Sequence, residues 1–236
     1  MRIPTNSKHI HFAILDEKDG VADVFTGLRR YPSSLFILFI TSNLYHTLKE
    51  KVESAVSSLK ILKPELQVKY LKNDLNDYWG TFFKVRELAT KIIENDKNVS
   101  FYANISTQNR VAAMAVRDAL ATLQTRSVCY YFKRGEGEEE MSEIIEVPIP
   151  PSHRDISKVL PILKTLYERG GKADSIEEIA KEVGRILSKS RNFDSQARLV
   201  EYYVKKLEVY AIVRVTSGRR KEVRLTGVPL LEARMR

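Results

Sequence analysis

The sequence predicts two domains of different class: an α/β Rossmann-like domain built on a mostly parallel sheet, followed by a winged helix-turn-helix. Three observations lead to this prediction. Short apolar segments alternate with amphipathic segments in the first part of the chain, a proline-rich run interrupts this order, and the remaining sequence has helical periodicity followed by a hairpin pattern. The expected domains cover residues 1–147 and 155–236, and the expected linker covers residues 148–154.

Strand and helix patterns alternate regularly in the first domain. The expected strands lie at 9–15, 35–41, 67–71, 99–105, 128–133 and 143–149. The expected helices lie at 21–29, 44–62, 77–94 and 110–123. The second strand, 35–41, is an apolar run, which suits a central parallel strand that is covered on both faces. This order of elements predicts a three-layer fold.

Proline marks the boundary between the two domains. Pro148, Pro150 and Pro151 lack backbone donors and disfavour helix in the residues before them, so they predict a stiff extended segment. The preceding stretch at 136–140 is acidic and contains glycine, which predicts a solvated hairpin or crossover tip.

Three amphipathic helices and a hairpin are expected after the linker. The first helix has apolar residues at helical spacing over 156–166 and ends at Gly170–Gly171, because glycine readily terminates a helix. The second begins after Asp174 or Ser175, and the spacing of Ser175 and Glu178 is that of a capping box.

The third helix, which starts at Asp194 or Ser195, is the candidate recognition helix. Its core-facing residues are expected to be Ala197, Leu199, Val200, Tyr203, Val204 and Leu207. The opposite face is expected to carry Gln196, Arg198, Glu201, Tyr202 and Lys205. Strands at 211–215 and 222–226 then flank a glycine turn that carries three consecutive cations, at 219–221.

Positive charge is concentrated in the second domain. Residues 1–151 hold 20 basic and 19 acidic side chains, whereas residues 152–236 hold 19 and 11. Lysine and arginine gain free energy by displacing condensed counterions from phosphates, so a basic module favours double-stranded DNA as its partner. General surface solubility is the alternative explanation of this charge.

A winged helix contacts DNA with the N-terminal part of its third helix and with its hairpin. Gln196 and Arg198 are expected to contact base edges, and the hairpin cations are expected to contact phosphate or the minor groove. The alternative is a solvated edge hairpin whose cations only prevent aggregation. The candidate DNA-binding residues are Arg191, Ser195, Gln196, Arg198, Tyr202, Lys205, Arg219, Arg220, Lys221 and Arg224.

Loops that follow predicted strands are candidates for ligand binding in the first domain. Open parallel sheets bind ligands beyond the carboxyl ends of their strands, where helix N-termini present backbone N–H groups. The loop at 104–110 offers short polar side chains and a cation there, although Ser106 or Thr107 could be an ordinary helix cap and no glycine-rich phosphate fingerprint is present. The candidate ligand-binding residues are Asp16, Glu17, Lys18, Asp19, Gly20, Ser42, Asn43, Asn104, Ser106, Thr107, Gln108, Asn109 and Arg110.

Four features together resemble the archaeal CARF-domain transcriptional regulators, where CARF denotes a CRISPR-associated Rossmann fold. They are the His-Ile-His-Phe strand at 9–12, the loop ending at 17–21, the strand end at 104–107, and the C-terminal winged helix. The resemblance covers nearly the whole chain. It implies a homodimer that binds a cyclic oligoadenylate across its axis and promoter DNA through its winged helix. Cyclic tetra-adenylate is the candidate effector, and no other cofactor is expected.

One position departs from the loop pattern of that family, Asn-x-Ser-x-Gly-x-Lys/Arg. Asn104, Ser106 and Arg110 match the pattern, whereas Gln108 stands in the place of the glycine. A side chain there hinders close approach of the backbone to a phosphate, so the ligand can differ from that of the family.

Some proteins with this sensory fold cleave their cyclic nucleotide, but the residues here favour binding without turnover. The histidines are scattered, and His9 and His11 share one face of the first strand, which indicates packing. Asp16, Glu17 and Asp19 could hold a metal, yet a solvated turn also explains three acids in one loop. The alternatives are a ring nuclease with a basic winged-helix module and a regulator whose first domain only dimerises.

The single cysteine and the hydropathy pattern predict a cytoplasmic protein. Cys129 lies in an apolar run and is expected to be a packed core thiol, which is compatible with a reducing compartment. The first residues lack the apolar core of a signal peptide, and the longest apolar run, at 35–40, is too short to span a bilayer.

Overall fold

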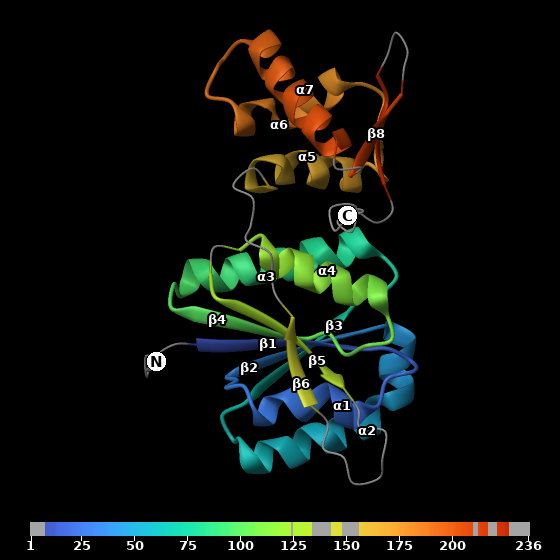
Figure 1. The fold of residues 1–236 in the computed structure, drawn as a ribbon, viewed down its shortest axis with the longest axis vertical. Helices are drawn as coiled ribbons and strands as arrows, with labels where there is room; N and C mark the ends of the chain where they lie inside the picture. Colours follow the sequence, from blue (N-terminus) through green and yellow to red (C-terminus); the bar gives the residue numbers. More distant parts are fainter. Residues whose placement is uncertain are drawn as a thin grey trace. The chain divides into compact units, whose positions relative to one another are not determined.

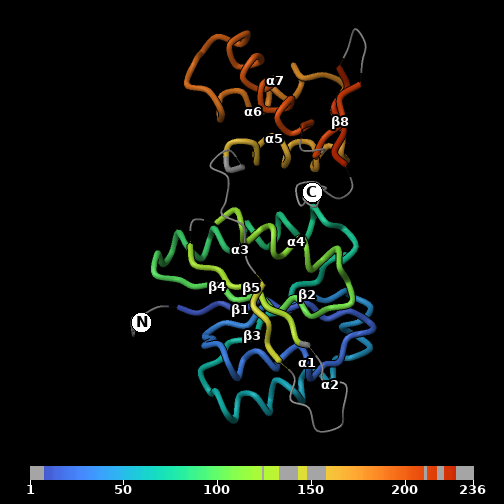
Figure 2. The backbone as a smooth tube through the Cα atoms, viewed as in Figure 1, coloured from blue at the N-terminus to red at the C-terminus, as the bar shows by residue number. Residues whose placement is uncertain are grey.

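The computed structural model describes residues 8–123, 125–133, 143–147, 156–209, 212–216 and 221–226. Its contacts divide the chain into two compact units, Met1–Ser152 and His153–Arg236, each with its own sheet (Figures 1 and 2). This division falls within the range 148–154 that the prolines indicate as a linker. The predicted acidic tip at 136–140, the linker itself and the hairpin residues Arg219 and Arg220 lie outside the described residues.

The first unit is built on a six-stranded sheet with the order β3-β2-β1-β4-β5-β6. Its strands are β1 (Lys8–Leu15), β2 (Leu35–Ile40), β3 (Gln67–Lys72), β4 (Val99–Asn104), β5 (Ser127–Lys133) and β6 (Glu143–Val147). The first five strands are parallel to their neighbours, and β6 pairs antiparallel with β5. The prediction of a mostly parallel α/β sheet is therefore confirmed.

Helices cover both faces of this sheet (Figure 1). One face is covered by α1 (Val21–Thr26), the short 3-10 helix η1 (Gly27–Arg29) and α2 (Ser42–Leu62). The other face is covered by α3 (Tyr78–Asn95) and α4 (Arg110–Ala121). Strands covered in this way need apolar side chains on both faces, and in β2 every residue after Leu35 is buried.

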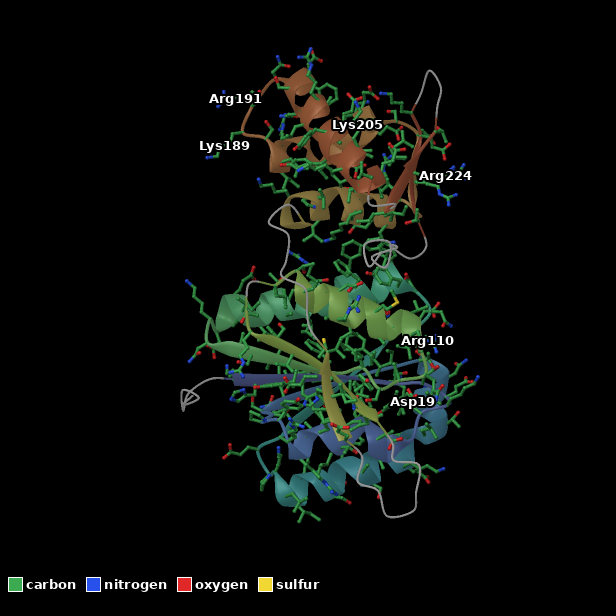
Figure 3. The ribbon with its side chains drawn as sticks, viewed as in Figure 1. Asp19, Arg110, Lys189, Arg191, Lys205 and Arg224 are labelled. Atoms are coloured by element: carbon green, nitrogen blue, oxygen red, sulfur yellow. The ribbon has the colours of Figure 1, made fainter. Side chains whose placement is uncertain are left out.

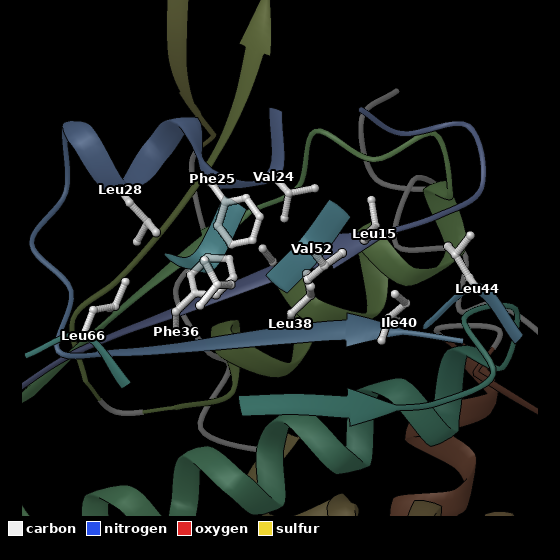
Figure 4. Packing of buried hydrophobic residues seen from close by; sticks show 12 residues of the cluster. Leu15, Val24, Phe25, Leu28, Phe36, Leu38, Ile40, Leu44, Val52 and Leu66 are labelled. Carbon is white, nitrogen blue, oxygen red and sulfur yellow. The ribbon is translucent and has the colours of Figure 1, made fainter. Parts of the chain in front are cut away.

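A hydrophobic cluster holds α1 and α2 against the sheet (Figure 4). Phe36, Leu38 and Ile40 of β2 pack in it with Leu44 and Val52 of α2. Burying one such side chain stabilises the fold by roughly 1.5–3 kcal/mol, so packing rather than helix propensity holds these helices in place.

Two helices of the first unit begin one or two residues away from their predicted starts because polar caps precede their apolar residues. α2 begins at Ser42, and the hydroxyl of Thr41 accepts a hydrogen bond from Leu44 N at 3.3 Å. α3 begins after Asp77, whose carboxylate accepts from Gly80 N at 2.9 Å. Each cap satisfies a backbone donor that the first turn of a helix leaves without a partner.

The second unit combines three helices with a small antiparallel sheet. Its elements are α5 (Ile156–Glu168), β7 (Lys172–Ala173), α6 (Ile176–Leu187), α7 (Phe193–Val209), β8 (Val213–Val215) and β9 (Val223–Leu225). The strand order is β7-β9-β8. The sequence did not predict β7, because two residues are too few for an alternating pattern.

Local signals around α5 and α6 act as predicted, with one shift. Gly170 and Gly171 follow α5 with φ of 75° and 87°, values that glycine adopts without strain. Ser175 caps α6 by accepting from Glu178 N at 3.3 Å. The Glu178 carboxylate accepts in return from Asp174 N at 3.2 Å, so the reciprocal bond of the capping box is displaced by one residue.

Among the described residues, no helix combines the length and the apolar character that crossing a membrane requires.

Candidate functional site

The carboxyl ends of β1 and β4 meet where the strand order of the sheet reverses. The chain continues from β1 to β2 and β3 on one side and from β4 to β5 on the other. Ligands bind at such points because the loops diverge and leave a crevice between them. Figure 3 shows Asp19 and Arg110, one from each loop, at this edge of the sheet. A cleft of about 240 Å³ lies here, lined by Ile14, Lys18, Asp19, Gly20, Asp23, Val24, Asn104, Ser106, Gln108 and Phe132.

The Asp19 carboxylate joins the two loops. Its Oδ1 accepts a hydrogen bond from Gln108 N at 2.8 Å. Its Oδ2 accepts from the Thr107 hydroxyl at 2.6 Å and from Asp16 N at 2.8 Å. Hydrogen bonds to an ionised acceptor are stronger than neutral ones. Asp19 therefore sets the width of the cleft as part of its wall.

Asn104 and Ser106 attach the second loop to the elements around it. Asn104 is 3% exposed, and its Nδ2 donates to the carbonyls of Asp23 and Val24 at 3.1 and 3.2 Å. Its Oδ1 accepts from Ser106 N at 3.0 Å, and the Ser106 hydroxyl accepts from Phe132 N at 2.8 Å. A buried amide needs such partners. The side chain of Asn104 thus links α1 to the loop that follows β4.

The cap of α4 is Asn109 rather than Ser106 or Thr107. Asn109 Oδ1 accepts from Ala112 N at 2.9 Å. The Thr107 hydroxyl accepts from Asn109 N at 3.1 Å while it donates to Asp19. The helix-cap explanation considered for this loop therefore applies to Asn109.

Other predicted ligand-binding residues of the two loops are exposed. Lys18 and Gln108 are exposed and line it, and Arg110 is exposed at the start of α4. Glu17 is also exposed. The apolar walls and the convergent polar groups are the combination found in small-molecule sites.

Ser42 and Asn43 lie in a separate hollow. That hollow, of about 470 Å³, is lined by Thr41, Ser42, Asn43, Lys72, Asn73, Asp74 and Lys84, and it shares no lining residue with the first cleft. Ser42 and Asn43 therefore do not line the cleft between the loops after β1 and β4, and their role in ligand binding stays a prediction. They follow β2, and the carboxyl end of β2 leads to a different part of the sheet edge.

His11 and Cys129 are buried in the core. The Nε2 atom of His11 is hydrogen-bonded to the Tyr130 hydroxyl, and burial lowers the pKa of His11 to about 3. Burial raises the pKa of Cys129 to about 12, so its thiol stays protonated. The packing roles predicted for His11 and Cys129 are confirmed. Across the described ranges, no group of three or more histidine, cysteine, aspartate or glutamate side chains could hold a metal ion.

Gln196 is buried, so its predicted place on the exposed face of the third helix is wrong. It is 5% exposed, and its Nε2 donates to the Ser190 carbonyl at 2.6 Å. A Cβ at Gly184 of α6 would lie 2.9 Å from Gln196 Cβ, so the two helices approach closely here. Helical spacing explains the burial, because positions 196, 200 and 203 share one face. Gln196 fixes the turn between α6 and α7 and cannot read bases from there.

Other residues predicted on α7 and in the loop before it are exposed. This set comprises Arg191, Ser195, Arg198, Tyr202 and Lys205. Figure 3 shows Lys189 beside Arg191 in the loop between α6 and α7. Lys189 is exposed too, and the sequence did not indicate it because the loop has no periodicity that would assign it to a face.

Acidic side chains pair with three of the predicted DNA-contacting cations. Glu201 accepts from Lys221 at 2.9 Å and lies 3.2 Å from the Lys205 ammonium. These two lysines hold the pKa of Glu201 below its usual value. Arg224 is bonded to Glu222. Exposed pairs of this kind are weak because water screens them, so a polyanion can compete for the cations.

No family model matches the sequence. An uncharacterised protein of Archaeoglobus fulgidus is 26% identical over 165 residues, which cover 70% of this chain and 68% of that protein.

Two solved structures align with most of this chain. Csm6 of Enterococcus italicus, bound to cyclic hexa-2'-fluoro-hexa-dAMP, aligns with a TM-score of 0.50 at 11% identity over 88% of this chain. The alignment spans 57% of that Csm6 chain, less than two thirds of its length. A type III CRISPR defence DNA nuclease activated by cyclic oligoadenylate aligns with a TM-score of 0.40 at 13% identity, over 88% of this chain and 31% of that one. The likeness to Csm6 establishes an α/β fold shared with that protein.

Proposed function

We propose that this chain is a ligand-responsive DNA-binding transcriptional regulator of CRISPR-Cas or related defence genes. In this proposal the first unit forms a homodimer and binds a cyclic oligoadenylate in the cleft between β1 and β4. The second unit is a winged helix-turn-helix that binds double-stranded DNA.

One observation carries the sensing part of the proposal. The cleft lies at the strand-order reversal of a sheet that shares its fold with a Csm6 structure bound to a cyclic hexa-dAMP analogue. Ile14, Val24 and Phe132 offer apolar walls for a base. Lys18 and Arg110 offer exposed cations for phosphates.

We further propose that the ligand is bound without being cleaved. Among the described residues, those that line the cleft include no histidine or cysteine, and the Asp19 carboxylate accepts hydrogen bonds from three donors. A side chain that must abstract a proton or attack a phosphate needs access to the ligand, which these bonds deny to Asp19.

The DNA-binding part is supported by element order and by charge. The second unit has the helix-strand-helix-helix-hairpin sequence of a winged helix, and residues 152–236 hold 19 basic against 11 acidic side chains. Exposed residues such as Arg191, Arg198 and Tyr202 gather on α7 and the loop before it, where a recognition helix meets the major groove.

Calorimetric titration with cyclic oligoadenylates of different ring size tests the sensing proposal. One ring size should bind, and the double variant Lys18→Gln with Arg110→Gln should weaken its binding roughly 10- to 100-fold, because charge-assisted hydrogen bonds are lost. The double variant Lys51→Gln with Lys60→Gln removes the same charge from the exposed surface of α2 and should bind normally. Absence of binding for every ring size would contradict the proposal.

Chromatography of the ligand after incubation with the protein tests whether it is cleaved. The ligand should be recovered intact, and linear products would identify a nuclease instead.

A further inference from the structure

Three cations lie in one row across the small sheet of the second unit. Lys172 of β7 is the register partner of Arg224 on β9, and Arg224 is the register partner of Arg214 on β8. All three are exposed. The adjacent positions Ala173 and Val223 are buried, so the row occupies the face of the sheet that points away from the core. Figure 3 shows Arg224 projecting from the hairpin away from the helices of this unit.

This arrangement works against the stability of the sheet. Like charges directly opposite each other on neighbouring strands are destabilising. Glu222 bonds to Arg224 and offsets part of the charge. The positive charge of Lys172 also helps to lower the pKa of Glu222, after the larger effect of Arg224, so Glu222 offsets part of the charge of two of the three cations. A surface that concentrates positive charge at a cost in stability is best explained by an anionic partner.

We propose that Lys172, Arg214 and Arg224 form a phosphate-binding row that contacts the backbone of nucleic acid, in addition to the contacts of α7. The inference rests on the proposed DNA binding of this unit. Neighbouring strands lie about 4.8 Å apart, so the row presents its charges over roughly 10 Å, a length that matches phosphates along a nucleic-acid strand. The side chains stand on a sheet rather than on a helix that enters a groove, so the row adds affinity without reading bases.

The exposed side chains around the row favour nucleic acid over a lipid surface. A peripheral membrane surface combines cations with apolar side chains that enter the bilayer. Among the described residues of this unit, the large exposed apolar side chains are Ile186, Phe193, Tyr202 and Val209, all on α6 and α7. The row therefore attracts phosphate without an apolar means of insertion.

The test compares two double variants of the full chain on a duplex of mixed sequence. Lys172→Gln with Arg214→Gln should lower the magnitude of the slope of log affinity against log salt by about 2, because each phosphate contact contributes about 0.9. Each single variant should produce about half of this change. The matched control, Lys158→Gln with Lys181→Gln, removes the same charge from exposed positions on α5 and α6 and should leave the slope unchanged. The thermal midpoint of the row variant should not fall below that of the control, because a like-charge contact is relieved.

Each outcome decides the inference. If the unmodified protein binds DNA but the row variant and its control have the same slope of log affinity against log salt, the phosphate-binding row is overturned. The proposed function then still stands. If the unmodified protein binds no duplex at any salt concentration, both fail. Binding to vesicles of phosphatidylglycerol that is stronger than binding to DNA, and that the row variant abolishes, identifies lipid as the partner and overturns the assignment to nucleic acid.

Discussion

His11 lies among aromatic side chains at the centre of the first sheet. Its ring is edge-on to Tyr130, with centroids 5.5 Å apart, and 6.2 Å from the ring of Tyr102. Within the described residues, its Nδ1 atom has no hydrogen-bond partner. Burial without a carboxylate partner penalises the charged imidazolium, which is why the pKa of His11 falls to about 3. The packing around β1 therefore requires that the imidazole of His11 be neutral.

This burial predicts that acid destabilises the first unit through His11. The histidine pKa is 6.5 in the unfolded chain and about 3 in the folded protein, so between these values the unfolded state binds one proton more. Above pH 6.5 the contribution of His11 to the free energy of unfolding is fully present. As the pH falls from 6.5 toward 3, this free energy decreases by about 1.4 kcal/mol per pH unit. Urea unfolding followed by the fluorescence of Trp79, the single tryptophan, reports on this unit. The variant His11→Phe should lose about 2 kcal/mol less than the unmodified protein between pH 7 and pH 5. Parallel pH profiles for the two proteins would show that His11 carries no such penalty.

At the scale of elements, most helices and strands of the first unit could be predicted because their signals are redundant. In α2 the apolar residues Leu44, Val52 and Val56 recur at helical spacing, and all three are buried. β7 could not be predicted, because its two residues become a strand only by pairing with β9. Tertiary pairing of this kind leaves no periodic signal in the sequence.

The candidate site was predictable in place but not in the role of each side chain. The loops after β1 and β4 could be located because parallel strands direct their carboxyl ends to one edge. Asn, Asp, Ser and Thr bond to nearby backbone groups with the same geometry that they offer to a ligand. The sequence could therefore not reveal that Asn104 donates a hydrogen bond to the carbonyl of Val24, or that Asp19 accepts one from Gln108 N.

The link between the two loops predicts a local effect of Asp19→Ala. Without the carboxylate, the amide of Gln108 loses its acceptor, and the loop after β1 is released from the loop before α4. Hydrogen exchange at the Gln108 amide should accelerate, while amides in the centre of β1 should exchange at the rate of the unmodified protein. Asp16→Ala removes a neighbouring carboxylate from the same loop and should leave Gln108 protected. Equal exchange at Gln108 in both variants would mean that the loops are held together by other contacts.

At the scale of the whole molecule, the two units differ in ways that suit the two parts of the proposed function. The first unit is nearly neutral and holds the cleft, and the second carries the excess of basic side chains. Charge supplies affinity for DNA but little choice between sequences or states. In the proposed function, control by a ligand therefore comes from the first unit, and the proposed homodimer presents two second units to one DNA site.

Removing the first unit tests this division. A chain that begins at residue 152 keeps α5 to β9 but lacks the proposed dimer contacts, so in the proposed function each copy of the second unit must find DNA independently. Linking two binding modules raises avidity by roughly 10²- to 10⁴-fold, and the truncated chain should bind weaker by a factor in that range. The full chain should protect a pseudo-palindromic site whose half-sites lie about one helical turn, or a multiple of it, apart. Circular dichroism of the truncated chain should show that its helices remain. Two results would contradict this prediction: undiminished affinity after truncation, or protection of one asymmetric half-site by the full chain. Either result would mean that the first unit does not hold two second units together on DNA. The cleft would then have to act on DNA binding within a single chain.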